Sequence, residues 1–398
     1  MRLLLVVDVF SPVRTSAAVQ MSDLAVALGR LGHQCTIVTP DAGLAEQHRL
    51  EREFCYSVLR IRSAPLKRIS LIRRALNEIL LSSRLWRGYR ASPAANQRFD
   101  GVIFYSPTIF LGRFVAKVKS LHHCPAYLIL RDIFPDWSAD LKLMRKGPHY
   151  WLFKAFAAYQ YSVADMIGVE SQASWDRFLK RLRRVEVLQN WIELDGEPAP
   201  DVPISQEILG AKILVYAGNM GIAQDLDNLV RLAQALAKRS DARLLFVGGG
   251  SERERIVFEV TQRQLKNVRF VSEVDPQTLR GLLRRCHVGL VSLDRRLRSH
   301  NIPGKLLSYL EAGLPVLASV NAGNEIKHIV EKGGAGVVTW NGDDGVLLSA
   351  ADRMLDDAEA HEEMSAAAMK LCKTLFSSSR AAEQVSRFFS APQAHRGY

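Results

Sequence analysis

Short apolar runs alternate with helical patterns through the first half of the chain. Residues 3–7 form an apolar run of strand length, and Met21, Leu24, Leu28 and Leu31 follow at helical spacing before Gly32. Further runs of strand length stand at 35–38, 102–105, 126–130, 166–169 and 185–188, with helical patterns between most of them. Continuous apolar strands that alternate with helices predict a parallel sheet covered by helices on both faces.

A second series of the same kind follows a proline-rich stretch, Glu197 to Pro203, which we interpret as a linker. Its strands are expected at 213–217, 244–247, 268–271, 288–291, 316–318 and 336–338, and two amphipathic helical stretches, 347–375 and 377–389, close the chain. The pattern predicts two α/β domains, 1–197 and 198–375, that face each other across a cleft and bind ligands at the carboxyl ends of their strands. Residues 376–398 are expected to form a helix that packs back towards the first domain.

The composition is that of an ordinary soluble enzyme, with 48% hydrophobic and 24% charged residues among 398. The five cysteines stand singly, which favours neither a zinc site nor a disulfide framework and fits a reducing cytosol. No apolar run reaches the roughly 18 residues of a spanning helix, and the apolar start is cut by Asp8 and lacks a small-residue cleavage site. We expect a protein that is neither exported nor threaded through a membrane.

Positive charge is concentrated in the first half, where residues 1–195 hold 28 Lys and Arg against 17 Asp and Glu. Between Arg60 and Arg90, nine basic residues face a single acid, Glu78. Apolar residues at helical spacing among them predict a basic amphipathic helix suited to an anionic membrane surface, with contacts from Arg68, Arg73, Arg74 and Trp86. A helix that only covers the core is the alternative. Nucleic acid is disfavoured, because no module with aromatic stacking positions is present.

An aromatic series follows in the first domain: Trp137, Tyr150, Trp151, Phe153, Phe156 and Tyr159. Such residues mostly fill a core, and part of the series also suits a membrane–water interface.

Two glycine-rich turns follow strands of the second domain. Residues 216–221, Tyr-Ala-Gly-Asn-Met-Gly, leave its first strand, and Gly248-Gly249-Gly250 leaves the next. Glycines there let backbone N–H groups approach an anion, although an ordinary strand-to-helix turn explains them equally well. The first strand of the chain is followed by no Gly-x-Gly-x-x-Gly, so a dehydrogenase is not expected, and the chain has no Gly-Lys-Ser/Thr phosphate loop.

The most specific segment is 299–315, Ser-His-Asn-Ile-Pro-Gly-Lys-Leu-Leu-Ser-Tyr-Leu-Glu-Ala-Gly-Leu-Pro. Pro303 suits the first turn of a helix, whose free N–H groups and positive dipole end attract anions. A cation at Lys305 is unfavourable there unless a phosphate lies beside it. A solvent-facing lysine is the alternative.

Together these segments resemble the bacterial glycosyltransferases of family 4, over essentially the whole chain. The resemblance rests on Leu31-Gly32-His33, the turns at 216–221 and 248–250, Pro303-Gly304-Lys305 and the closing 312–316, Ala-Gly-Leu-Pro-Val. Residues 131–137, Arg-Asp-Ile-Phe-Pro-Asp-Trp, the 217–221 turn with Gln224, and 301–305 are most similar to the subgroup that includes the N-acetylfucosamine transferases of O-antigen assembly. The resemblance implies a GT-B fold of two Rossmann-like domains, a sugar nucleotide held mainly by the second domain, and retaining transfer without a bound metal or other cofactor.

The same resemblance implies the site. Arg131, Asp132 and Lys305 are the expected catalytic residues, and the donor is expected to contact Gly218, Asn219, Met220, Gly221, Gln224, Gly248, Val274, His300, Asn301, Pro303, Gly304, Lys305 and Ser308. The chain departs from the family pattern at several of these positions. His300 and Ser308 replace two glutamates, Asn219 and Gln224 replace an arginine and a lysine, and Arg131 stands where the family has a histidine. Lys305 is the expected replacement for the lost diphosphate ligands.

The function expected from the resemblance is transfer of a sugar from a UDP-sugar to a lipid-linked acceptor, in assembly of lipopolysaccharide O-antigen or another surface polysaccharide. The sugar is expected to be an N-acetylated deoxyhexosamine such as N-acetylfucosamine, the acceptor an undecaprenyl-diphosphate sugar, and the location the cytoplasmic face of the cell membrane. Attack by the acceptor hydroxyl on the face of the leaving phosphate is favoured over double displacement, which needs a carboxylate nucleophile. A nucleotide-sugar epimerase of the same fold and a catalytically silent binding subunit are the alternatives.

Overall fold

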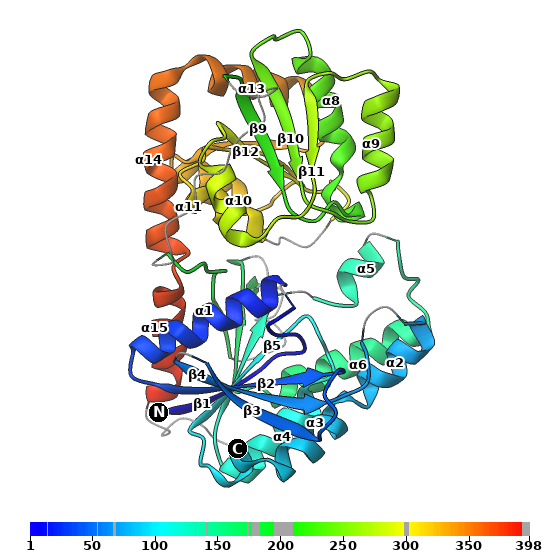
Figure 1. The fold of residues 1–398 in the computed structure, drawn as a ribbon, viewed down its shortest axis with the longest axis vertical. Coiled ribbons are helices and arrows are strands. Elements are labelled where there is room, and N and C mark those ends of the chain that lie inside the picture. Colours follow the sequence, from blue (N-terminus) through cyan, green and yellow to red (C-terminus); the bar gives the residue numbers. More distant parts are fainter. Residues whose placement is uncertain are drawn as a thin grey trace. The chain divides into compact units, whose positions relative to one another are not determined.

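The computed structural model describes residues 1–13, 15–53, 55–66, 69–131, 133–140, 142–172, 175–176, 184–194, 210–297 and 302–391. The chain divides into two compact units (Figure 1). Unit 1 comprises Met1–Glu193 with Ser378–Tyr398, and unit 2 comprises Leu194–Ser377. The expected linker at 197–203 lies outside the described residues.

Unit 1 is built on an eight-stranded sheet with the order β3-β4-β2-β1-β5-β6-β7-β8. All its neighbouring strands are parallel except β3 and β4, which pair antiparallel. The central strands are almost wholly buried, as their continuous apolar sequences require. The strands are β1 Arg2–Val6, β2 Gln34–Asp41, β3 His48–Glu53, β4 Tyr56–Arg62, β5 Gly101–Tyr105, β6 Ala126–Leu130, β7 Met166–Val169 and β8 Val185–Val187.

Helices cover both faces of this sheet. On one face, α1 packs against α15, the helix that ends the described chain, so a segment of the C-terminus completes unit 1. On the other face, α2 packs on α3, α3 on α4, and α4 on α6. The helices are α1 Ser16–Arg30, α2 Leu71–Ile79, α3 Leu81–Ala91, η1 Pro93–Asn96, α4 Gly112–His122, α5 Asp136–Asp140, α6 Pro148–Val163 and α15 Ser378–Ser390.

Two sequence-based expectations for unit 1 are wrong. The sheet is mixed rather than parallel, because the polar edge strand β3 and its partner β4 form a hairpin whose weak apolar pattern gave no strand prediction. The basic segment 60–90 is not one helix, since β4 runs to Arg62 and the helical part is divided between α2 and α3. Arg60 is buried in β4 and pairs with Glu51 at 2.8 Å, so this charge does not face outward.

Unit 2 has a parallel six-stranded sheet, in the order β11-β10-β9-β12-β13-β14. Helix α8 packs with α9 and α13 on one core cluster, and α11 packs against α14. The strands are β9 Lys212–Ala217, β10 Ala242–Val247, β11 Val268–Val271, β12 Val288–Ser292, β13 Val316–Val320 and β14 Gly336–Trp340. The helices are η3 Ile222–Gln224, α8 Leu226–Leu236, α9 Arg253–Gln262, α10 Pro276–Leu283, α11 Gly304–Glu311, α12 Ile326–Lys332, α13 Asp344–Asp356 and α14 Ala358–Leu375.

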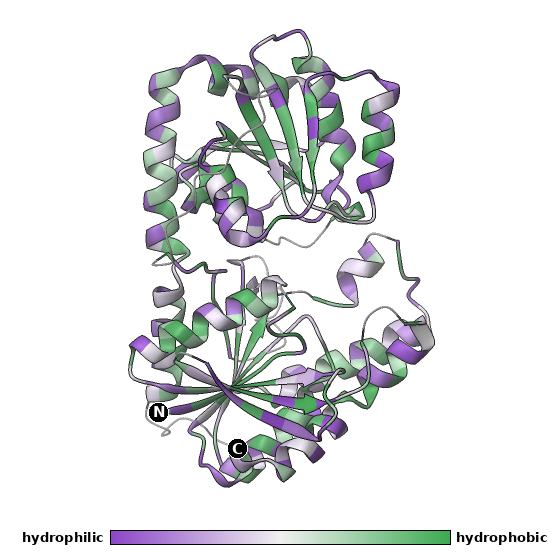
Figure 2. Cartoon of the chain, in the orientation of Figure 1, coloured by the Kyte–Doolittle hydropathy of each residue, from purple (hydrophilic) through white to green (hydrophobic). Residues whose placement is uncertain are grey.

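Hydrophobic residues are concentrated in the sheets of both units (Figure 2). The expected helix 347–375 is two helices, because Asp357 ends α13 and caps α14 by accepting a hydrogen bond from the N–H of Ala360 at 3.0 Å. Among the described residues, no helix is long and apolar enough to cross a membrane.

Candidate functional site

The glycine turns after β9 and β10 are packed backbone against backbone. The N–H of Met220 donates to the carbonyl of Gly249 at 2.7 Å, and the N–H of Glu252 donates to the carbonyl of Met220 at 2.9 Å. Gly248 and Gly250 have φ of +129° and +142°, and a Cβ on either would overlap the backbone of the opposite turn. The glycines therefore allow two turns at the carboxyl edge of the sheet to touch.

This packing decides which N–H groups remain for a ligand. The amides of Gly218 and Met220 are bonded to β10 and to the turn after it. The amides of Asn219 and Gly221 donate to no residue that the structure describes. The turn can offer an anion these two N–H groups, and the exposed Asn219 carries its side-chain amide beside them.

Lys305 lies in the first turn of α11, as the sequence predicts, and its side chain reaches the same turn. Its Nζ donates to Oε1 of Gln224 at 3.0 Å and lies 4.7 Å from the centre of the Tyr216 ring. Among the described residues, no carboxylate forms an ion pair with this ammonium. Burial lowers the pKa of Lys305 to about 8, because nothing nearby compensates the desolvated charge. A partly buried cation held only by an amide and an aromatic face is suited to an anionic ligand.

The start of α11 adds further donors. Pro303 caps the helix without a side-chain hydrogen bond, and the amides of Gly304 and Lys305 have no acceptor among the described residues. Ser308 follows Lys305 by about one turn on the same helix and is half-buried. Lys305, Gln224 and the 218–221 turn are thus brought together, whereas Val274 lies on the separate loop between β11 and α10. His300 and Asn301 lie outside the described residues.

Two tyrosines to which the sequence assigns no individual role support this arrangement. The hydroxyl of Tyr216 donates to the carbonyl of Asn219 at 2.7 Å, which fixes the turn, while its ring supports the ammonium of Lys305. The hydroxyl of the fully buried Tyr309 accepts from the N–H of Ala217 at 2.8 Å and donates to the carbonyl of Leu290 at 3.2 Å. Both occupy positions that a core pattern also explains, so no sequence signal marks them.

Arg131 lies at the carboxyl end of β6 in unit 1, and its side chain is buried and bonded to backbone carbonyls. Its guanidinium donates to the carbonyl oxygens of Leu188 and Gln189, at 2.6 and 3.2 Å, and lies 4.8 Å from the Trp191 ring centre. Only Nε is buried without a partner. Arg131 thus ties the end of β6 to the segment after β8. Asp132, its predicted companion, lies outside the described residues.

A buried polar network lies at the same edge of unit 1. Tyr105 donates to Oε1 of Gln20 at 2.7 Å, Gln20 donates to Oδ1 of Asn190 at 3.3 Å, and Asn190 donates to Glu170 at 3.1 Å. The indole of Trp191 donates to the carbonyl of Gln20 at 2.8 Å. This network was not predicted from the sequence. The available signal was that Glu170 stands directly after one predicted strand and that Asn190 stands two residues after another.

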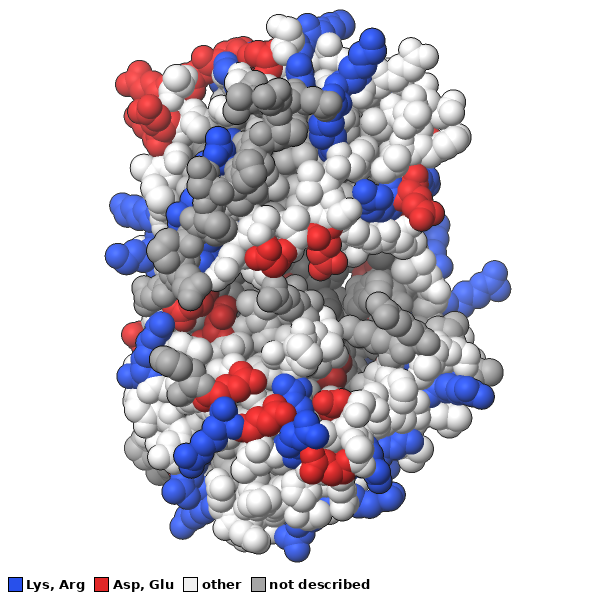
Figure 3. All heavy atoms as spheres, viewed as in Figure 1, with Lys and Arg blue, Asp and Glu red and all other residues white. Residues whose placement is uncertain are grey.

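The predicted membrane residues differ in their surroundings. Arg73 and Arg74 are exposed on α2, and Arg74 pairs with Glu78 at 2.8 Å. Trp86 is half-buried on α3 beside Lys117 and Arg90, whose cationic groups lie 5.4 and 5.8 Å from its ring. Arg68 lies outside the described residues. In Figure 3, the charged side chains along the margin of unit 1 near α2 and α6 are mainly basic.

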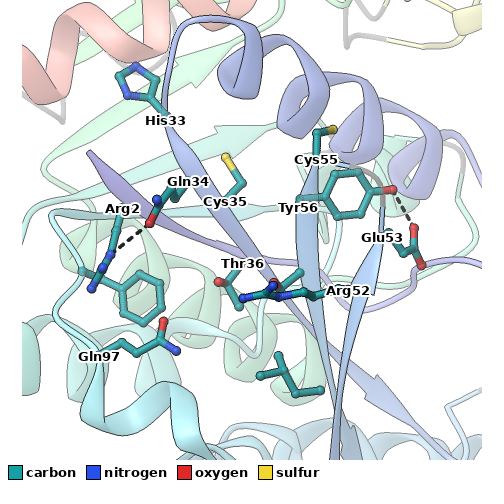
Figure 4. Close-up of a pocket in the computed structure, with 13 residues that line it drawn as sticks. Arg2, His33, Gln34, Cys35, Thr36, Arg52, Glu53, Cys55, Tyr56 and Gln97 are labelled. Carbon is teal, nitrogen blue, oxygen red and sulfur yellow. Dashed lines mark hydrogen bonds between the residues drawn. The ribbon is translucent and has the colours of Figure 1, made fainter.

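A pocket of about 620 Å³ lies elsewhere, at the amino ends of β1, β2 and β4 (Figure 4). Arg2 donates to Gln34 there at 3.1 Å, and Tyr56 donates to Glu53 at 2.9 Å. Ligands of open α/β sheets bind at the carboxyl ends of the strands, so this pocket is not the candidate site. Across the described ranges, no group of three or more His, Cys, Asp or Glu side chains could hold a metal ion.

The second unit of the chain is similar to a known protein family. Residues 201–371 match the family model of the glycosyl transferases group 1, a region that contains the 218–221 turn and Lys305. The matched region lies within unit 2. The chain is 26% identical over 223 residues to the probable glycosyltransferase WbjE of Pseudomonas aeruginosa, covering 54% of this chain and 55% of that protein.

A second relative is the putative colanic acid biosynthesis glycosyl transferase WcaI of Escherichia coli K12, which is 25% identical over 247 residues. The match covers 58% of this chain and 60% of WcaI, so the chain spans little more than half the length of these curated relatives.

Solved structures resemble the chain along nearly all its length. Sucrose-phosphate synthase from Thermosynechococcus elongatus superposes with a TM-score of 0.73 at 16% identity, covering 98% of both chains. Anabaena HepE in complex with UDP and glucose gives a TM-score of 0.66 at 14% identity, covering 98% of this chain and 99% of HepE. The chain has the GT-B fold. The predicted fold class is therefore confirmed, with the correction that the sheet of unit 1 is mixed.

Proposed function

We propose that the protein is a retaining glycosyltransferase that moves a sugar from a UDP-sugar to a lipid-linked acceptor at the cytoplasmic face of a membrane. The observation that carries the proposal is the ammonium of Lys305 beside the 218–221 turn, which is partly buried and pairs with no carboxylate of the described residues. Lys305 lies within residues 201–371, which match the group 1 glycosyl transferase model, and the similar fold of HepE was determined with UDP and glucose bound.

The proposed chemistry is one substitution at the anomeric carbon, in which the acceptor attacks on the face that the leaving phosphate occupies, so that the configuration is retained. The acceptor hydroxyl oxygen forms the new glycosidic bond while the bond from that carbon to the UDP oxygen breaks, and the leaving phosphate takes the hydroxyl proton. Negative charge then grows on the diphosphate. Lys305, the free N–H groups of Asn219 and Gly221, and the start of α11 are the groups that would stabilise it. We assign no step to a metal or to a protein carboxylate.

The residues of unit 1 are proposed to position the acceptor. Arg131 contributes by holding the segment after β8, which carries the buried Asn190 beside Glu170. The acceptor is proposed to be an undecaprenyl-diphosphate sugar and the transferred group an N-acetylated deoxyhexosamine. The similarity to WcaI supports a role in polysaccharide assembly, since WcaI is described as a putative colanic acid biosynthesis glycosyl transferase.

The test is an incubation of the purified protein with a panel of labelled UDP-sugars and membranes that carry lipid-linked monosaccharide. Transfer of label to the lipid with one donor is the expected result. The control is the same incubation without acceptor membranes, because an epimerase would convert the UDP-sugar into its epimer in the absence of an acceptor. Donor binding without transfer to any lipid-linked sugar would instead identify a binding subunit, and either outcome would overturn the proposal.

A further inference from the structure

Helix α6 of unit 1 is apolar on both of its faces. A helix that covers a core normally shows polar residues outward. Among the exposed residues of α6 none is Lys, Arg, Asp or Glu. Trp151 is 63% exposed, Leu152 50% and Tyr159 43%, and Leu143 in the preceding turn is 55% exposed. The exposed residues of the helix are Pro148, His149, Trp151, Leu152, Ala155, Ala158, Tyr159 and Ser162.

The inner face of the same helix makes the contacts with the core. The exposed residues therefore belong to a separate face of the helix. Phe153 and Phe156 lie against Phe110, with ring centres 6.3 and 5.1 Å away. Gln160 accepts from the N–H of Leu111 at 3.0 Å and donates to the carbonyl of Thr108 at 2.7 Å.

The amino end of α6 is fixed as well. The buried Asp136 of α5 accepts from the hydroxyl of Tyr150 at 2.8 Å and pairs with Lys154 at 3.1 Å. The rotation of α6 about its axis is therefore set at both ends, and Trp151, Leu152 and Tyr159 stay outward.

Basic residues stand where this apolar face begins. Lys142, Arg145 and Lys146 precede the helix, all three are exposed, and none forms an ion pair with a described residue. Helix α2 belongs to the same helical layer, since Ile79 and Phe153 pack against one core cluster. It adds the exposed Arg73 and Leu76, and the exposed Leu80 directly follows it. In the chain, α2 follows β4, and α6 follows β6 and the short helix α5, so both come after the carboxyl ends of strands of the parallel part of the sheet.

We propose that this surface, defined by Leu143, Trp151, Leu152 and Tyr159 with Lys142, Arg145 and Lys146, docks unit 1 on an anionic lipid bilayer. Tryptophan and tyrosine suit the interface between headgroups and acyl chains, leucine inserts beyond it, and the three cations meet the negative surface potential. Docking there brings the carboxyl edge of the unit 1 sheet to the headgroups, where a lipid-linked acceptor presents its sugar. The inference rests on the proposed function for this last step only.

Vesicle binding tests the surface without donor or acceptor, so its result is independent of transferase activity. We expect the wild-type protein to co-sediment with vesicles of phosphatidylglycerol and phosphatidylcholine at low ionic strength, and to bind pure phosphatidylcholine at least tenfold more weakly. The double variant Trp151→Glu with Leu152→Glu should lose at least tenfold in binding. Phe258→Glu is the matched control, because Phe258 is 60% exposed on α9 of unit 2.

A second measurement locates the contact. Brominated phosphatidylglycerol should quench part of the tryptophan fluorescence of the wild type, and Trp151→Phe should bind vesicles but lose that part. Wild-type binding that the double glutamate variant retains in full would overturn the proposal. So would a protein that ignores anionic vesicles and instead elutes as a dimer that the two glutamates dissociate, because a second copy would then cover α6.

Discussion

Lys305 and Arg131 are two partly or fully buried cations, each at the carboxyl edge of a sheet, and they are bonded in opposite ways. Arg131 in unit 1 donates to two backbone carbonyls and stacks on Trp191, so its guanidinium group makes contacts within the folded protein. Within the part of the chain that the structure describes, Lys305 in unit 2 is held only by Gln224 and the face of Tyr216. A charge without a compensating partner costs folding energy, which a ligand can recover. The comparison separates a cation that stabilises the protein from one that remains available to a substrate.

Replacement of Lys305 should give the largest change in activity. Lys305→Met keeps the length of the side chain and removes its charge, so turnover at saturating UDP-sugar should fall roughly 100-fold or more, as for loss of one group that stabilises a leaving oxyanion. The melting temperature should not fall, because the variant removes a desolvated charge. Steady-state kinetics and thermal unfolding of the same preparations provide the two measurements.

Gln224→Leu is the control for local geometry. It removes the hydrogen-bond partner of Lys305 and leaves the ammonium in place, so its turnover should fall far less than that of Lys305→Met. Equal losses in the two variants, or full turnover in Lys305→Met, would contradict the assignment of Lys305 to the leaving diphosphate.

Replacement of Arg131 should change stability first. Arg131→Met leaves the carbonyls of Leu188 and Gln189 without their donor, and a buried unsatisfied group costs roughly 1–3 kcal/mol. We expect the free energy of unfolding to fall by about 2–4 kcal/mol, measured by urea denaturation. The fully folded fraction should keep most of its affinity for UDP. A variant as stable as the wild type that has lost activity would show that Arg131 acts on the substrate instead.

The sequence predicts the parts of the molecule that depend on local pattern. The parallel strands, the first turn of α11 and the position of Lys305 follow from apolar runs, Pro303 and the family-like segment. The hairpin β3–β4 did not follow, because its outer strand is charged and half exposed. The contacts of Arg131 could not be predicted either. They join residues 57 and 58 positions apart along the chain, and local spacing contains no information on which carbonyls a guanidinium reaches.

The exposed face of α6 also shows that a local sequence pattern does not tell which residues of a helix pack in the core. An aromatic series between strands predicts core, and Phe153 and Phe156 do pack there. For Trp151 and Tyr159 this interpretation was wrong, since both are exposed. The amino-acid sequence shows that this helix is apolar. The structure adds that Phe153 and Phe156 pack inward, whereas Trp151 and Tyr159 lie on the outer, exposed face.

The smallest expected effect is the pH dependence of UDP binding, which tests the uncompensated charge directly. The pKa of Lys305 is lowered by burial to about 8, below its ordinary value of 10.5. In the absence of ligand, the folded protein therefore releases this proton more easily than the unfolded chain, so stability should rise with pH between about 8 and 10.5. The diphosphate favours the protonated form. UDP affinity should consequently be constant below pH 8 and fall above it, by at most about tenfold per pH unit. Isothermal titration calorimetry from pH 7 to pH 9.5 measures this slope, and Lys305→Met should abolish it. A slope that persists in that variant would assign the proton to another group, and the contrast with Arg131 would no longer explain how the site binds phosphate.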